Sequence, residues 1–161
     1  MDGWTDFYVA EVGAAAALAG LLVVAISINI QRIMQYPALP GRAGQTVVMI
    51  GSALVIASLA LLPGQPHLYF GLEAIAAGLF VAATGIAESV SALRRRKTGD
   101  PLAWTVVPLA MIAISSLPDL IGGTMLAAGI EAGLYWIAVG IVLSFIATLQ
   151  NGWVLLVEIL R

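Results

Sequence analysis

Five long apolar runs dominate the chain, and short segments rich in proline, glycine or charge separate them. Runs of about 20 apolar residues match the thickness of a bilayer's hydrocarbon core, so each predicts a transmembrane helix. A membrane barrel would need alternating strands of about 10 residues, and the pattern lacks them. The predicted spans are 7–33, 45–62, 68–93, 102–128 and 132–160.

Two of these runs are irregular. The fourth contains Pro108 and Pro118, and a glycine pair follows the second proline, which predicts a kink or a stop near Pro118. The fifth would be about 43 Å long as one helix, against a hydrocarbon thickness of about 30 Å. It therefore either tilts and protrudes or breaks at residues 151–152, after which residues 153–161 would lie along the membrane surface.

Composition agrees with this pattern, since 61% of the residues are hydrophobic and 10% are charged, with a mean hydropathy of +1.02. Such a chain has too few polar side chains to cover a water-soluble globule, so lipid must be its solvent. The sequence predicts an all-α integral membrane protein, a bundle of about five transmembrane helices that forms a single domain over residues 1–161.

The basic residues predict the orientation of this bundle. All of them fall at alternate ends of the apolar runs, and the positive-inside rule places those ends in the cytoplasm. The N-terminus is then outside and the C-terminus inside. Acidic rather than basic residues precede the first run, so we expect it to stay as a span and not to be cleaved as a signal peptide. The basic residues are Arg32, Arg42, Arg94, Arg95, Arg96, Lys97 and Arg161.

Several functional classes conflict with the residues present. A net charge of −2 offers no basic surface for nucleic acid, and the lack of cysteine removes disulfides and thiolate ligands. The only histidine, His67, and the only lysine, Lys97, are predicted at opposite membrane faces, so they cannot serve one catalytic site. We therefore expect no enzyme, no metal site and no cofactor.

Four acids are predicted at one depth, near the outer ends of the spans: Glu11, Glu73, Asp119 and Glu131. A ring of carboxylates concentrates cations, as it does at the mouths of cation channels, so these residues are candidates for an outer acidic vestibule. The alternative is that each acid is simply hydrated at the membrane interface.

Toward the inside, uncharged polar side chains lie at comparable depth on the first and fifth spans: Ser27, Asn29, Gln31, Gln150 and Asn151. They are candidates for a polar lining of an inner vestibule, although amides at this depth also form structural hydrogen bonds between helices. No charged residue is expected near mid-membrane.

Small residues recur at four-residue spacing on the first span. Gly13, Ala16, Ala17 and Gly20 allow the backbone of another helix to approach closely. The spacing favours a packing face inside one protomer over a subunit interface, because such spacing is common in alanine-rich spans.

Three segments, 17–29 (ALAGLLVVAISIN), 39–44 (LPGRAG) and 62–65 (LPGQ), give the first 65 residues a family resemblance. This part resembles a family of small bacterial multi-span proteins of unestablished function, some of them labelled modulators of a membrane-bound AAA protease. The resemblance implies a location in the bacterial inner membrane.

Two functional hypotheses follow. In the first, several identical copies form a channel or pore for monovalent cations, which the outer acids attract. In the second, the chain is a non-conducting partner that regulates or scaffolds a larger complex, such as a membrane-bound protease. Short connectors leave little surface for a partner, which favours an assembly of identical copies in the bilayer.

Overall fold

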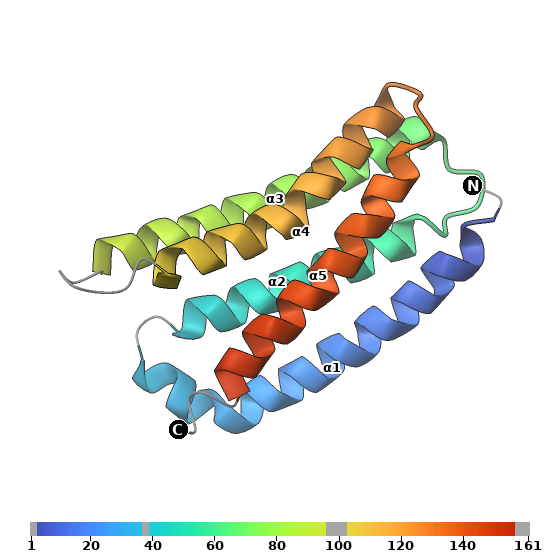
Figure 1. Cartoon of the computed structure of the whole chain (residues 1–161). Helices are drawn as coiled ribbons and strands as arrows, with labels where there is room; N and C mark the ends of the chain where they lie inside the picture. The colour runs from blue at the N-terminus through green and yellow to red at the C-terminus, as the bar shows by residue number, and fades with distance from the viewer. Residues whose placement is uncertain (1–2, 37–38, 96–102, 157–161) are drawn as a thin grey trace.

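The computed structural model describes residues 3–36, 39–95 and 103–156, and these form five α-helices and no strand (Figure 1). Each helix is long and apolar enough to cross a membrane. The described architecture is therefore all-helical, and its five apolar helices suggest a multi-pass membrane protein. The helices are α1 (Thr5–Gln35), α2 (Leu39–Leu59), α3 (His67–Arg95), α4 (Ala103–Ala127) and α5 (Gly133–Leu156).

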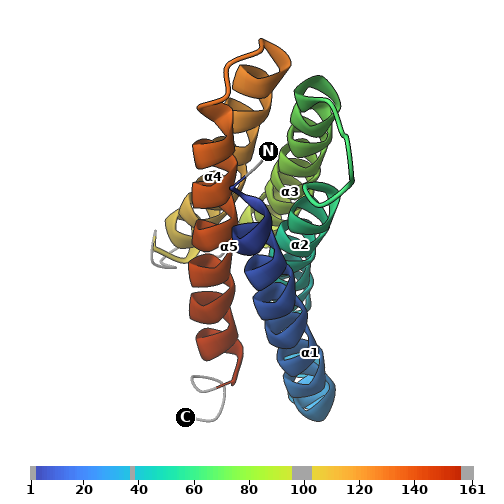
Figure 2. The same cartoon turned by 90° about the vertical axis from the view of Figure 1, so that its right-hand side faces the viewer.

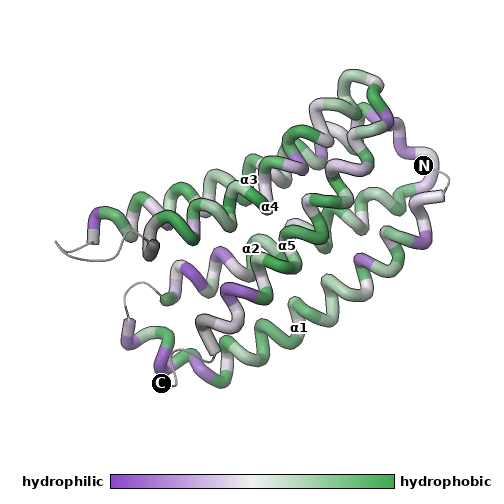
Figure 3. The backbone as a smooth tube through the Cα atoms, viewed as in Figure 1, coloured by the Kyte–Doolittle hydropathy of each residue, from purple (hydrophilic) through white to green (hydrophobic). Residues whose placement is uncertain are grey.

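Short connections make successive helices antiparallel, so the bundle has two chemically different ends (Figure 1). We call the end that carries Arg32, Arg42 and Arg94 the basic end. The other, which carries Glu11 and the α2–α3 and α4–α5 turns, is the acidic end. Hydrophilic positions gather toward the two ends, and the helices between them are mainly hydrophobic (Figure 3).

The structure moves one predicted boundary and decides two predicted irregularities. Helix α2 begins at Leu39 and carries a proline in its first turn, where a missing N–H costs nothing. The prediction allowed α4 either to kink or to stop near Pro118. It does not stop there, because the helix continues to Ala127. A proline deprives only one carbonyl of its donor, and tight packing on both sides of α4 offsets that loss. Helix α5 likewise passes through residues 151–152 without a break; residues 157–161 lie outside the described residues.

Helix α4 packs between α3 and α5 through two adjacent glycines. A Cβ atom on Gly123 would lie 2.6 Å from the Gly71 carbonyl oxygen of α3. One on Gly122 would lie 2.6 Å from the Gly133 carbonyl oxygen of α5. The three backbones thus approach more closely than any side chain would allow, which gives the dispersion contacts that hold helices together in lipid.

Helix α1 is the least buried element. In the most apolar 18-residue stretch of α1, only 11% is buried within the protomer, whereas the corresponding share in α5 is 44%. It lies against α2 and α5 (Figure 2) and leaves large side chains such as Leu21 and Ile28 exposed. This arrangement is typical of a helix that faces lipid or a second protein over much of its circumference.

Candidate functional site

The most unusual side chain of the interior is Asp119 on α4, which is 2% exposed. Eight residues, or about 12 Å at 1.5 Å per residue, separate it from the end of the helix at Ala127. Asp119 is therefore enclosed by the bundle, whereas the sequence predicts a hydrated side chain at the outer rim. Its depth in a membrane, and the expectation of no charged residue near mid-membrane, stay predictions.

The Asp119 carboxyl group points toward α5, where Gly140 makes room for it. A Cβ atom at position 140 would overlap the Asp119 Oδ1 atom and lie 3.1 Å from its Cγ atom. On the same face of α5, Ile137 and Ile141 are fully buried on either side of the glycine. The Asp119 Oδ1 atom has no hydrogen-bond partner in the described structure. Burying a carboxyl group without a hydrogen-bond partner costs free energy, so this arrangement calls for an explanation.

Tyr8 on α1 is a second titratable residue whose polar atom is buried without a hydrogen-bond partner among the described residues. Its side chain is 1% exposed. Aromatic rings surround it at the acidic end. We call this group the aromatic cap; it consists of Trp4, Phe7, Tyr8, Phe70 and Tyr135, with neighbouring ring centroids 4.8–6.1 Å apart.

On the basic-end side of Asp119, α4 carries a buried hydroxyl one turn away. Ser115 is 1% exposed and donates a weak hydrogen bond to the Met49 sulfur of α2 at 3.4 Å. The adjacent Ser116 is also buried, but it donates to the Ile112 carbonyl oxygen of its own helix at 2.8 Å. Ser115 therefore links the Asp119 face of α4 to α2.

Ser115 and Asp119 form a stripe along one face of α4, and α5 carries a second stripe. Gly140, Ser144, Thr148 and Asn151 follow one another at spacings of four, four and three residues, so they share one face. Ser144 and Thr148 are 3% and 0% exposed, and the Thr148 hydroxyl group has no hydrogen-bond partner. Beginning beside Asp119, the stripe reaches the basic end at Asn151.

A third stripe lies on α2 and consists of Gln45, Met49 and Ser52. The Gln45 side chain is buried and donates from Nε2 to the Val81 carbonyl oxygen of α3 at 3.2 Å. The Ser52 hydroxyl oxygen is buried without a partner. We call the buried side chains of the three stripes the polar column, which comprises Gln45, Ser52, Ser115, Asp119, Ser144 and Thr148.

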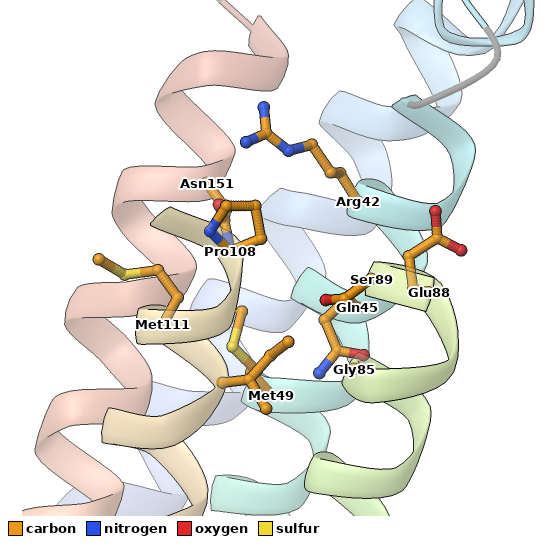
Figure 4. A pocket seen from close by; sticks show the side chains of 10 residues that line it. Arg42, Gln45, Met49, Gly85, Glu88, Ser89, Pro108, Met111 and Asn151 are labelled. Atoms are coloured by element: carbon orange, nitrogen blue, oxygen red, sulfur yellow. The ribbon is translucent and has the colours of Figure 1, made fainter. Parts of the chain in front are cut away.

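The basic-end members of the α2 and α5 stripes, Gln45, Met49 and Asn151, line a partly open pocket between α2, α3, α4 and α5 (Figure 4). Its free volume for water-sized molecules is about 30 Å³. One water needs about 10–15 Å³ on this measure, so the pocket holds about two. The lining residues are Arg42, Gln45, Met49, Gly85, Glu88, Ser89, Pro108, Met111, Ile112 and Asn151.

Two opposite charges lie at this pocket. Arg42 comes from the first turns of α2, and Glu88 comes from α3. The Glu88 carboxyl group fills the space beside Gly41, where it would overlap any Cβ atom. An anion beside the first turn of a helix is favourable because the unpaired N–H groups there carry partial positive charge. The pocket can thus attract and orient water or a small ion.

The remaining acids of the predicted vestibule stay at the acidic end. Glu11 and Glu73 are half-buried, and Glu131 is exposed in the α4–α5 turn. Glu73 accepts a hydrogen bond from Gln65 Nε2 at 2.6 Å. In the described part of the chain, no three acidic or histidine side chains come together in a way that could hold a metal ion.

Of the five predicted inner lining residues, only Asn151 lines the pocket. Ser27 and Asn29 donate to carbonyl oxygens of α1 itself, those of Val23 at 2.7 Å and Ala25 at 2.9 Å. Gln31 and Gln150 are exposed. A lining formed by all five is therefore absent, because the α1 members face outward.

The predicted packing face of α1 is exposed as well. Gly13, Ala16, Ala17 and Gly20 all lie on the surface, and a Cβ atom added to either glycine would meet nothing within 4 Å. The expectation that this face packs inside one protomer was wrong. The tight glycine contacts instead use α3, α4 and α5.

Sequence reasoning missed Gln45, Ser115 and Thr148 as members of an inward-facing set. Their signal was the recurrence of polar residues at three- and four-residue spacing on α2, α4 and α5. Comparison with protein families, with curated proteins and with solved structures finds no match for this chain. The family resemblance of residues 1–65 stays a prediction, and the function must be argued from the site itself.

Proposed function

We propose that the protein transports a small monovalent cation across the membrane through the interior of each protomer, with Asp119 as the group that binds the cation. The observation that supports this most is a buried carboxyl group with an unpartnered oxygen at the closed end of a polar column that begins in an open pocket. Ionisable groups at such depth are expensive, and they mark ion pathways in membrane proteins.

A purely structural role for these groups explains less. Structural hydroxyls in transmembrane helices usually donate to a carbonyl of their own helix, as Ser27 and Ser116 do. The hydroxyl groups of Thr148 and Ser52 have no such partner, and neither does Asp119 Oδ1. Unpartnered buried groups call for an explanation, of which unseen water or an ion is the commonest kind. A hydrated transport path accounts for all three atoms together.

We place the basic end in the cytoplasm of a bacterium, following the positive-inside rule and the family resemblance. The pocket then opens inward, and the aromatic cap faces outward. Glu11, Glu73 and Glu131 at the outer end raise the local cation concentration there. We also retain an assembly of identical copies, but the path lies within each copy and not on an axis between them. The proposal assigns no catalysis to the chain.

The test is cation flux into proteoliposomes made with the purified protein. Asp119→Asn removes the ionisable group with almost no change in shape, and it should reduce flux to the level of empty liposomes. Glu131→Gln makes the same change in charge on an exposed turn and should leave most of the flux. Equal flux for the wild type and Asp119→Asn, with both proteins folded by circular dichroism, would overturn the proposal.

A second function is favoured by one observation, the exposed small-residue face of α1. Gly13 and Gly20 leave open space that another helix can enter. In that case the chain would be a non-conducting partner of a larger complex, such as the protease to which the family resemblance points. Absence of flux from the wild type, together with a specific crosslink from the α1 face to a different protein, would favour this function.

A further inference from the structure

We infer that the cation bound at Asp119 is a proton, and that water entering from the basic-end pocket carries it along the polar column. This inference rests on the proposed transport function and names its substrate. It draws on three features of the described residues: the poor ligand set around Asp119, the size of the pocket, and the chemistry of the groups between them.

A metal cation needs oxygen ligands in place of the hydration shell that it loses. The Asp119 carboxyl group lies against Gly140, which has no side chain to offer a ligand, and its Oδ1 atom has no hydrogen-bond partner among the described residues. One carboxyl group and one phenol, that of Tyr8, do not replace such a shell. A proton needs only the carboxyl oxygen itself, with which it forms a covalent O–H bond.

Other charged groups on the packed helices lie elsewhere. Helix α3 carries Glu73, which is paired with Gln65, and Glu88, which lies beside the first turn of α2. Among the described side chains of α5 the titratable group is Tyr135, in the aromatic cap. Arg42 of α2 lines the pocket, and Glu11 of α1 lies near the acidic end. No positive charge among the described residues therefore faces Asp119 and competes with a proton for the carboxylate.

The size of the pocket also favours a proton over a hydrated metal ion. Its free volume of about 30 Å³ holds about two waters, which is too little for a metal ion with a full hydration shell. A proton needs no extra room, because it moves by exchange of hydrogen bonds from one water to the next.

The side chains of the polar column can take part in this exchange of hydrogen bonds between waters. Each hydroxyl group donates one hydrogen bond and accepts two, so Ser115, Ser144 and Thr148 can join a chain of waters in either direction. The unpartnered atoms of Thr148 and Asp119 mark positions on that chain where a water can bond. None of these groups carries a fixed charge that would hold a metal cation on the way.

The transfer step is balanced without a further reactant. A hydronium ion in the column gives its proton to the Asp119 carboxylate, which leaves water and a neutral carboxylic acid. Release is the reverse reaction, in which a water beside Asp119 accepts the proton and the carboxylate is restored.

Proteoliposomes containing a pH-sensitive dye separate the possible ions. A potassium diffusion potential should drive proton uptake by the wild type, with none by Asp119→Asn, whereas uptake of labelled sodium or rubidium should stay at the level of empty liposomes. Asp119-dependent uptake of a metal ion without proton uptake would overturn the inference and leave the proposed transport function standing. Absence of Asp119-dependent flux of any ion would overturn both.

Two further measurements do not depend on the Asn variant alone. Thr148→Val keeps the side chain's shape but removes its hydroxyl group, and it should lower proton uptake several-fold. Its matched control, Thr124→Val, changes an exposed threonine that bonds within α4 and should leave uptake unchanged. In infrared difference spectra, a pH step should change a carboxylic-acid carbonyl band that is missing from Asp119→Asn. A band that is equal in both proteins would contradict the inference.

Discussion

The two ends of the bundle differ in what separates Asp119 from the surface. Toward the basic end lie hydroxyl and amide groups that lead to a pocket large enough for water. Toward the acidic end lies the aromatic cap, which has rings in close contact and Tyr8 as its inner member. The proposed path therefore has one wet end and one dry end, and a path open to one side only is what a carrier needs in order to avoid a leak.

Removal of the aromatic cap should have the largest effect on this difference between the two ends. The chain lacks cysteine, so Ser144→Cys provides a unique thiol in the polar column. A small polar thiol reagent should label it from the basic end only, whereas Gln65→Cys should label from the acidic end. Adding Tyr8→Ala to Ser144→Cys should make the introduced thiol reactive from both ends, because it removes a fully buried ring of the cap.

Truncating a buried aromatic residue to alanine costs about 3–5 kcal/mol, so the result needs a second variant. Tyr8→Phe keeps the ring and removes only an unpartnered hydroxyl group. It should keep the acidic end closed and the thiol of Ser144→Cys protected from that side. Labelling from both ends in the Tyr8→Phe background would mean that the ring does not form the barrier.

The wet side can be perturbed at Gly140. Gly140→Ala places a methyl group against Asp119 Oδ1, so the carboxyl group or α5 must move. Overpacking of this kind costs about 1–3 kcal/mol, and flux should fall because the carboxyl group leaves its position. Gly152→Ala on the same helix meets only Leu22 Cδ1 at 3.6 Å, an ordinary contact. Thermal unfolding in detergent and flux assays should separate the two variants, and equal behaviour would count against the tight α4–α5 contact.

The smallest effect on the protomer is expected at α1, outside both ends of the path. Gly20→Leu adds a side chain where nothing lies within 4 Å. The free energy of unfolding of the protomer should change by no more than about 0.5 kcal/mol, as for other surface changes. If copies assemble through this face, size-exclusion chromatography should show a smaller assembly for Gly20→Leu than for Leu21→Ile. A large loss of protomer stability would contradict the exposed position of this face.

The helices were predictable from the sequence because their signal is local. An apolar run of sufficient length satisfies its own backbone hydrogen bonds in lipid, whatever surrounds it. Helix boundaries were harder to predict at prolines. Pro40 lies inside the first turn of α2, and Pro118 lies inside α4, since proline costs little at a helix start and neighbouring helices offset its cost elsewhere.

The site could be predicted only in part, because burial depends on partners distant in the sequence. The spacing of Ser144 and Thr148 shows that they share a face, but only the positions of α2 and α4 show that this face is the inner one. Ser27 has the same chemistry on an exposed face of α1. Asp119 was identified as a candidate but expected at a hydrated rim, because only the packing of α4 against its neighbours shows that its side chain is buried.

The adjacent glycines of α4 also restrict how the helices can move. Because Gly122 contacts the backbone of α5 and Gly123 contacts that of α3, a rotation of α4 about its own axis would break both contacts. The three helices are thus a rigid frame, and the pivot of any opening motion has to lie outside it. Helix α1 carries Tyr8, has the least buried surface and contacts α2 far more than α5, so we expect it to move more easily than the other helices.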